Sequence, residues 1–566
     1  MSVVASVQRE NRFTRRKLFG AGYGLLALAG LTSLIPACSS TPATPVASAP
    51  AAATRQPAAT TAPAAATPRP VATTAPAAAP ASTPNPTSET PVSGGILRAT
   101  LGAEPQTMDP HKTTTLFSND VRANLFDGLI ANDTSQGPKP GLAETWESPD
   151  AKEWTFHLRS GVTFHDGNPL TAGIVQATFE RILDPKTAAV SRLQMERAIA
   201  SVSAPDDLTV KFALKEADAA FPTLLGGIKV VPKNFDATKP IGTGPFQFVE
   251  WVRNQHVKLS KFPNYFLKGL PYLDGVVFQP VPDEDQKITL LETGQVDFID
   301  TIPLPRVKEV QQGGQIQVFA VAPGVSPAYY WMLVNGARAP LSDPKVRQAL
   351  NFAIDRKAQL EVTFGQGIIR SDLIPPKHWA FNSKALSFDD RDVARAKKLL
   401  ADAGHANGFS LQLKHITSRA EYASIAQLFQ SDLAEIGVKV SIVPLEIGIW
   451  TEQVRVKHDY DLGLTGVLPD ADPDLIFAEV DPSLPGGQAL GWKNDQFEQL
   501  LQKGRAVVDQ EARKTYYATA QEIFAEDSPG FVINERPILS GASPAVRGFV
   551  QNINQNTVFT TVWLKK

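Results

Sequence analysis

Residues 39–92 form a tract that cannot build a folded core. The tract contains no aromatic side chain, its only large aliphatic residues are valines, and its charged residues are Arg55, Arg69 and Glu89. Alanine, proline and threonine dominate the rest. Such a composition cannot bury enough apolar surface to offset the conformational entropy that ordering removes, so we expect a disordered, semi-extended spacer.

The residues before the tract are typical of an export signal. Arg12, Arg15, Arg16 and Lys17 precede an uncharged stretch that ends in small residues, LFGAGYGLLALAGLTSLIPA. The pair Arg15-Arg16 resembles a twin-arginine signal, which marks proteins for export in the folded state; general secretion is the alternative route. We expect residues 1–37 to be this signal. A permanent membrane span is the alternative, since roughly 18 apolar residues suffice to cross a bilayer.

Cys38 is the only cysteine of the chain, so a structural disulfide within the chain is excluded. Residues 35–38 resemble a bacterial lipobox, with an aliphatic residue, an alanine and then the cysteine. The resemblance implies cleavage before Cys38 and a lipid on its thiol; an incidental small residue in an apolar segment is the alternative. We therefore expect residues 38–92 to be a lipid anchor and linker that tether a body at the extracellular or periplasmic face of the cell membrane.

The body, residues 93–566, is long enough for two or three domains. The formal net charge of the whole chain is −2 and no large block of like charges occurs, so nothing favours a nucleic-acid partner. No apolar run within the body approaches the length of a bilayer span. The body is therefore expected to be soluble.

Apolar residues recur with helical spacing in three segments of the body, which are 343–354, 393–403 and 425–436. Asp343 and Pro344 suit the N-cap and the first helical position of the first segment. The third segment stops at Gly437, and the alternation typical of a strand follows at 438–442. A helix that passes directly into a strand favours α/β layering.

A β-hairpin is predicted for residues 154–164. Its first arm alternates apolar and polar side chains, a turn falls at Ser160-Gly161, and the second arm returns through Val162 and Phe164. The apolar residues of the first arm are Trp154, Phe156 and Leu158.

Several motifs occur along the body in a fixed order. They include LFDGLI, LRSGVTFHDGNPLTA, IGTGPFQFVEW, DPKVRQALNFAIDR and DLAEIGVKVSI. In this order they resemble the extracellular solute-binding proteins of ABC importers, in the oligopeptide/dipeptide/nickel class known as bacterial solute-binding protein family 5. The resemblance spans nearly the whole body.

The resemblance implies an α/β fold in the form of a two-lobed clamp like that of periplasmic binding proteins, with ligand between the lobes. Lobe I is expected at 93–330, with an extra inserted subdomain at about 143–240. Lobe II is expected at 331–535, and residues 536–566 return to lobe I. The chain is expected to cross between the lobes near Tyr330 to Asn335 and near Phe531 to Pro537.

The resemblance also implies a function. The protein is expected to be a monomer that captures a peptide-like ligand outside the cell and hands it to an ABC permease with its ATPase subunits. An oligosaccharide, a nickel chelate or an opine-like compound is the alternative solute.

Enzyme motifs are missing from the chain. The segment GVSPA lacks the second glycine of a nucleophile elbow, the histidines form no His-Glu-x-x-His, and IGTGPF lacks the Gly-Lys-Ser/Thr of a phosphate loop. We expect no enzyme, no cofactor and no bound metal, with a secreted hydrolase as the remote alternative.

An acidic run begins at Asp470. Asp470, Asp472 and Asp474 alternate as at the start of a calcium loop, but Leu475 stands where that loop needs glycine and Pro473 interrupts the run. A solvated turn is the alternative. In peptide-binding relatives an aspartate near this place pairs with the α-ammonium of the peptide, and the resemblance implies that role for Asp470.

Arg419 matches the position at which a dipeptide-binding relative has an arginine that takes the ligand carboxylate. A guanidinium pairs bidentately with a carboxylate, although a surface salt bridge at the start of the next helix is the alternative. Asp470 and Arg419 together would select a zwitterion. The resemblance further places Thr114 and Thr115 in a loop that borders the ligand.

Aromatic rings are expected to supply the less specific part of ligand binding, with core packing as the alternative for each. The candidates are Tyr330, Trp331, Trp450 and Trp492.

Overall fold

The structure, a computed structural model, describes residues 89–131, 137–417, 419–469 and 471–566. The predicted export signal, Cys38 and most of the linker therefore lie outside the described residues. Within the described ranges, no helix is both long and apolar enough to cross a membrane.

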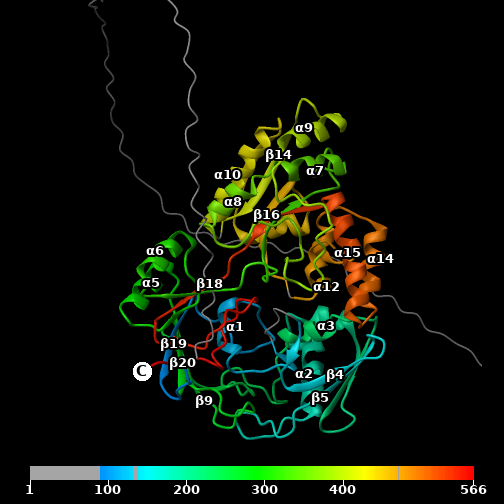
Figure 1. Cartoon of the computed structure of the whole chain (residues 1–566). Helices are drawn as coiled ribbons and strands as arrows, with labels where there is room; N and C mark the ends of the chain where they lie inside the picture. Colours follow the sequence, from blue (N-terminus) through cyan, green and yellow to red (C-terminus); the bar gives the residue numbers. More distant parts are fainter. Residues whose placement is uncertain (1–88, 132–136, 418, 470) are drawn as a thin grey trace, which may run out of the picture. The chain divides into compact units, whose positions relative to one another are not determined.

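A seven-stranded mixed sheet contains strands from distant parts of the sequence (Figure 1). Strand β1 lies inside the sheet and pairs in parallel with β10 and β11, and β18 pairs antiparallel with β11 and β12. In spatial order the strands are β12 (Gln317–Ala320), β18 (Leu539–Ala542), β11 (Phe298–Ile299), β1 (Ile96–Leu101), β10 (Gly275–Pro280), β9 (His256–Lys261) and β8 (Phe246–Val252). The helices of this part are α1 (Leu116–Arg122), α5 (Glu284–Glu292) and α6 (Val307–Gly313).

A four-stranded antiparallel sheet with its own apolar core is inserted between β1 and β8 in the sequence. Its strands, in spatial order, are β4 (Ala143–Glu147), β5 (Glu153–Leu158), β7 (Thr209–Leu214) and β6 (Ile199–Ser203). Its helices are α2 (Ala172–Leu183), α3 (Arg192–Ala198) and α4 (Phe221–Leu224). Two short strand pairs lie elsewhere, β2 (Ile130–Ala131) with β3 (Lys139–Pro140) and β19 (Val546–Arg547) with β20 (Trp563–Leu564).

The hairpin predicted for residues 154–164 is wrong. Trp154, Phe156 and Leu158 do share a buried face of β5. However, β5 pairs with β4 along one edge and with β7 along the other, so no edge is left for a second arm. Thr163 forms an isolated bridge with Pro169 instead. Tertiary strand pairing overrode the local pattern.

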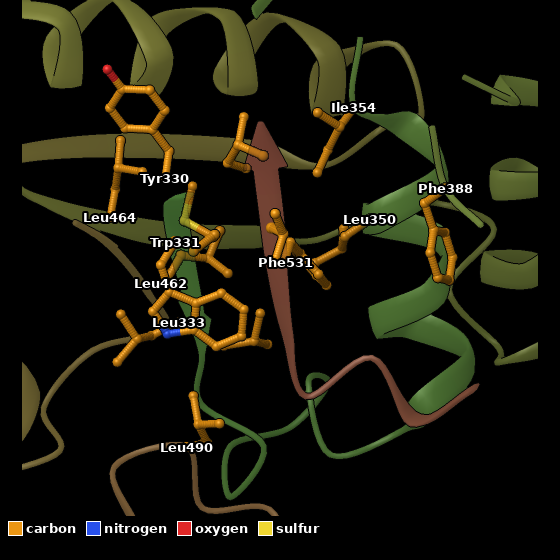
Figure 2. Close-up of a cluster of buried hydrophobic side chains, with 14 of the residues drawn as sticks. Tyr330, Trp331, Leu333, Leu350, Ile354, Phe388, Leu462, Leu464, Leu490 and Phe531 are labelled. Carbon is orange, nitrogen blue, oxygen red and sulfur yellow. The ribbon is translucent and has the colours of Figure 1, made fainter. Parts of the chain in front are cut away.

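A five-stranded mixed sheet forms a second framework, with helices around it (Figure 1). In spatial order the strands are β15 (Lys439–Leu445), β14 (Ser410–Ile416), β16 (Leu462–Val467), β13 (Tyr329–Val334) and β17 (Gly530–Glu535). The main helices are α7 (Pro344–Ala353), α8 (Arg356–Val362), α9 (Val393–Asp402), α10 (Ala420–Ala434), α14 (Asp495–Arg505) and α15 (Gln510–Asp527). Figure 2 shows side chains of β13, β16 and β17 packed together in its core.

The three predicted helices of the body are confirmed as α7, α9 and α10. The Asp343 carboxylate accepts a hydrogen bond from the Lys345 N–H, and Pro344 occupies the first position of α7. Val346, Ala349 and Leu350 are buried at helical spacing. The strand expected after Gly437 is β15. These elements were predictable because their signals are local in the sequence.

Two crossings connect the seven-stranded and five-stranded sheets. The first runs from the end of β12 to Tyr329 and the second from Glu535 to the start of β18. The residues predicted to cross, 330–335 and 531–537, lie mostly within β13 and β17, which pair antiparallel. The predicted domain limits, 143–240 included, stay a prediction.

Glu89, in the last residues of the linker, contacts the C-terminal part of the chain. Its carboxylate accepts from Arg547 at 3.1 Å and from Lys565 at 2.5 Å. Both contacts are solvent-accessible, so they fix where the linker leaves the body more than they add stability.

Deletion of residues 39–87 is expected to leave the melting temperature of the protein unchanged within error, because a tract with few large apolar side chains and no aromatic ones contributes no core. Differential scanning calorimetry measures this, with Glu89→Gln in the full chain as the control for the linker contact. A loss of several degrees in the deletion alone would show that the tract packs on the body.

Candidate functional site

A pocket lies between the second crossing and elements of both sheets. It is lined by Leu116 at the start of α1, the loop after β11, Tyr330 of β13, the start of α10, residues 536–539 of the second crossing, and Gln551 with Gln555. Side chains from segments far apart in the sequence thus face one volume. We call this volume the inter-sheet pocket.

Some charged groups of the inter-sheet pocket have an ion-pair partner in the protein and others have none among the described residues. The Asp300 carboxylate forms an ion pair with Lys287 at 2.8 Å and accepts from the Thr100 hydroxyl at 2.7 Å, so its charge is compensated. The Arg419 guanidinium, by contrast, forms no hydrogen bond or ion pair with any residue that the structure describes. Arg536 adds a second guanidinium to the lining. The Glu421 carboxylate also lines the pocket, so the pocket offers two guanidinium groups to an anionic part of a ligand and a carboxylate to a cationic part.

The aromatic candidates have different positions. Tyr330 lines the inter-sheet pocket and makes an edge contact with Tyr422. Trp331 is fully buried and stacks on Phe524.

The other two tryptophans are also buried, and each donates its indole N–H within the protein. The acceptor is the Lys414 carbonyl for Trp450 and the Asp527 carboxylate for Trp492. The structure therefore places Tyr330 in the pocket and the three tryptophans in the core, where the alternative of core packing accounts for them.

The predicted threonine loop lies next to the inter-sheet pocket. Thr115 is the N-cap residue of α1, immediately before Leu116, and its hydroxyl donates to Ser118 at 3.0 Å. Thr114 is exposed. Neither threonine lines the pocket itself.

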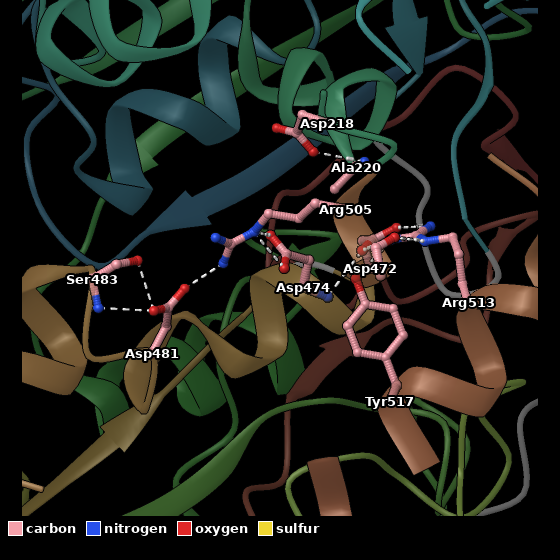
Figure 3. A network of polar contacts seen from close by, with 10 residues as sticks. Asp218, Ala220, Asp472, Asp474, Asp481, Ser483, Arg505, Arg513 and Tyr517 are labelled. Carbon is pink, nitrogen blue, oxygen red and sulfur yellow. Dashed lines mark hydrogen bonds and ion pairs between the residues drawn. The ribbon is translucent and has the colours of Figure 1, made fainter. Parts of the chain in front are cut away.

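The acidic run forms a buried ion-pair network (Figure 3). Arg513 pairs with both carboxylate oxygens of Asp472, at 2.9 and 2.7 Å, and Arg505 bridges Asp474 and Asp481. The solvated turn proposed for this run is therefore wrong for Asp472 and Asp474. The described residues contain no group of three acidic, histidine or cysteine side chains placed to hold a metal ion. Asp470 lies outside the described residues.

Sequence reasoning missed Arg536, Asp300, Gln551 and Gln555 as pocket residues. Arg536 falls in the predicted second crossing, so a charged residue in that segment was an available signal. The other three come from loops whose approach to the pocket depends on tertiary structure, and no local pattern marks them.

The two crossings are tied to each other beside the pocket. Glu535 at the end of β17 accepts a hydrogen bond from the Gly324 N–H of the first crossing at 2.9 Å, and the Arg536 N–H donates to the Ala328 carbonyl at 3.0 Å. Burial raises the pKa of Glu535 to about 7, although nearby Arg370 opposes the rise.

Comparison with known proteins gives the family. Residues 137–481 match the family model described as "Bacterial extracellular solute-binding proteins, family 5 Middle". The chain belongs to this family. It is a solute-binding protein of the ABC-transporter type, and the predicted family is confirmed.

Three relatives illustrate the similarity. The glutathione-binding protein GsiB of Escherichia coli (strain K12) is 28% identical over 471 residues, which cover 79% of this chain and 90% of that protein. The periplasmic binding protein DppA of Helicobacter pylori, solved with the peptide STSA, has a TM-score of 0.69 and 28% identity, covering 84% of this chain and 99% of that one. The binding protein AgaA of A. tumefaciens R10, solved with agropinic acid, has a TM-score of 0.68 and 29% identity, covering 83% and 99%.

These neighbours confirm the predicted fold class. The chain has the α/β, two-lobed fold of periplasmic binding proteins, and the family consists of binding proteins rather than enzymes. The inter-sheet pocket is lined by residues of the second crossing and of both sheets.

Glu535→Gln is expected to flatten the dependence of stability on pH. Because the folded-state pKa of Glu535 is raised from 4.5 to about 7, its ionisation disfavours the fold, and its contribution lowers the free energy of unfolding as pH rises between these values. The loss amounts to on the order of 2–3 kcal/mol. Denaturant unfolding at several pH values measures it. Glu526→Gln, at an exposed position, is the control, and parallel pH profiles for all three proteins would contradict this assignment.

Proposed function

We propose that the protein is a lipid-anchored extracellular solute-binding protein that captures a peptide-like ligand and delivers it to an ABC permease. The proposal combines the family, which is a family of solute-binding proteins, with the guanidinium groups that line the inter-sheet pocket. Delivery requires a permease that recognises the ligand-bound conformation, because a ligand shifts a conformational equilibrium only through its different affinity for the two states.

Arg419 is the single observation that carries the peptide-like class. Its guanidinium lines the pocket without a protein partner among the described residues, and a carboxylate is the group that a guanidinium binds best. A relative named as a glutathione-binding protein and a neighbour solved with a peptide support a ligand that bears carboxylates.

An opine-like compound is the second candidate. The neighbour solved with agropinic acid is as similar to this chain as the peptide-bound neighbour is. A ligand of this kind would also present a carboxylate to Arg419. The two candidates differ at the other end of the ligand. A peptide has an α-ammonium there, which the peptide hypothesis pairs with Asp470.

Arg419→Ala and Asp470→Ala are each expected to weaken binding of a peptide ligand at least about thirtyfold. Loss of one partner of a desolvated ion pair typically costs on the order of 2–5 kcal/mol, and roughly 1.4 kcal/mol is a factor of ten in affinity. The measurement is isothermal titration of the solute that mass spectrometry identifies in the purified protein.

Arg395→Ala, at an exposed position of α9, is the matched control and is expected to bind like wild type. Loss of affinity in Arg419→Ala alone would replace the peptide by a ligand with one anionic end. Wild-type affinity in both Arg419→Ala and Asp470→Ala would exclude a zwitterionic ligand altogether.

Cys38→Ser is expected to abolish the lipid anchor, because a serine hydroxyl cannot take the place of the modified thiol. The protein should then move from the membrane fraction to the soluble fraction or remain as an uncut precursor. Fractionation and mass spectrometry of the mature N-terminus report both outcomes. A variant that fractionates and migrates like wild type would rule Cys38 out as the anchor.

A further inference from the structure

A second pocket is lined by the C-cap residue of α1 and by residues that follow this helix. Its volume is about 450 Å³, within the range of about 300–1,000 Å³ that is usual for small-molecule sites. It shares no lining residue with the inter-sheet pocket. We call it the posterior pocket.

One wall separates the two pockets. Helix α1 begins at the inter-sheet pocket with Leu116, and its C-cap residue Ala123 lines the posterior pocket. Residues 550–561 also face both ways, since Gln551 and Gln555 line the first pocket while Asn556 and Val558 line the second.

Hydrogen bonds connect the residue after the C-cap of α1 to residues 557–559. The Asn124 side chain donates to the Thr557 carbonyl at 2.8 Å and accepts from the Phe559 N–H at 2.9 Å. The inter-sheet pocket and the posterior pocket are therefore two distinct pockets.

The sides of the posterior pocket are largely apolar. Phe266, Leu270 and Val558 line it, and at its edge Leu267 is 37% and Val550 is 72% exposed. Large aliphatic side chains with this much exposure, gathered around a hollow, leave apolar surface that a ligand is able to cover.

A polar pair lies among these apolar groups. The Asp127 carboxylate accepts from the Thr243 hydroxyl at 3.1 Å and from the Tyr265 hydroxyl at 3.4 Å, which leaves lone pairs free. The Lys229 ammonium forms no hydrogen bond or ion pair with any described residue. Burial raises the pKa of Asp127 and lowers that of Lys229, while each charge opposes the shift of the other. The two groups therefore interact without direct contact.

We propose that the posterior pocket is a second ligand site, for a small uncharged amphiphile with an apolar body and a head that both donates and accepts hydrogen bonds. A primary amide or an alcohol between the two groups would accept from Lys229 and donate to Asp127. A charged head would face one like charge at short range in a partly desolvated site, which is unfavourable. Lys139, at the exposed rim, is not part of this pair. The site is independent of the solute proposed above.

The test uses three probes with the same eight-carbon skeleton, which are octanamide, octanoate and octylammonium. Octanamide is expected to bind the full-length protein at least about tenfold more tightly than either charged probe, a difference of roughly 1.4 kcal/mol or more. Titration at neutral pH, followed by saturation-transfer NMR and calorimetry, measures the affinities. No binding of any probe, equal binding of all three, or tightest binding of a charged probe would overturn the proposal.

Two charge variants test the head group in the folded protein. Asp127→Asn leaves Lys229 as the single charge of the pair, so the affinity for octanoate should rise relative to the affinity for octylammonium. Lys229→Met leaves Asp127, so the preference should reverse. Circular dichroism checks the fold of each variant, and unchanged head-group preference in both would show that the probes do not contact this pair.

A filling variant locates the site. Val558→Trp is expected to abolish octanamide binding, whereas Leu208→Trp, at an exposed position after β6, should bind as wild type. Arg419→Ala should also keep octanamide affinity, because Arg419 belongs to the other pocket. Octanamide binding that survives Val558→Trp, or that is lost in Arg419→Ala, would place the probe elsewhere and overturn the proposal.

Discussion

Polar contacts at the two chain crossings determine where the groups that line the inter-sheet pocket lie. Arg370 is fully buried and donates to the carbonyls of Pro327 and Ala328 in the first crossing, at 2.9 and 3.0 Å. Glu535, at the start of the second crossing, accepts from the Gly324 N–H. A buried guanidinium is costly unless its donors are satisfied, so Arg370 is stable only while the first crossing keeps its path.

These contacts explain the geometry of the inter-sheet pocket. Tyr330 lies two residues after Ala328, at the second position of β13, and Arg536 follows Glu535 directly. The backbone of both pocket residues is thus set by the crossings and not by the loops around the pocket. A change at Arg370 or Glu535 would therefore move Tyr330 and Arg536 in the inter-sheet pocket, although neither Arg370 nor Glu535 lines that pocket.

Local signals made part of this molecule predictable. The cap at Asp343 and the spacing of the apolar residues gave α7, because helix boundaries depend on neighbours in the sequence. The order of the family motifs gave the fold class. The hairpin failed because β5 found partners that lie outside the predicted segment, and sequence patterns do not reveal which strands will pair.

The site was harder to predict than the fold. Arg419 and Tyr330 do line the inter-sheet pocket, but Trp331 points into the core from the next position of the same strand. Adjacent residues of a strand face opposite sides of the sheet. A run of aromatic residues in a strand therefore does not reveal which ring lines a pocket and which packs in the core. The burial of Asp472 likewise depends on its ion pair with Arg513, a residue far along the chain that no local pattern identifies.

The ion-pair network around Asp472 has a consequence for how the two parts of the chain meet. Within the five-stranded part, Asp472 and Asp474 are already paired with arginines. The inserted subdomain adds one more contact, in which the Ala219 N–H donates to the Arg505 carbonyl at 2.8 Å. Next to this contact, burial and the charge of Asp472 raise the pKa of Asp218. Since the arginines are held by their own carboxylates, they compensate Asp218 only in part. The cost of ionising Asp218 therefore opposes this contact between the inserted subdomain and the five-stranded part.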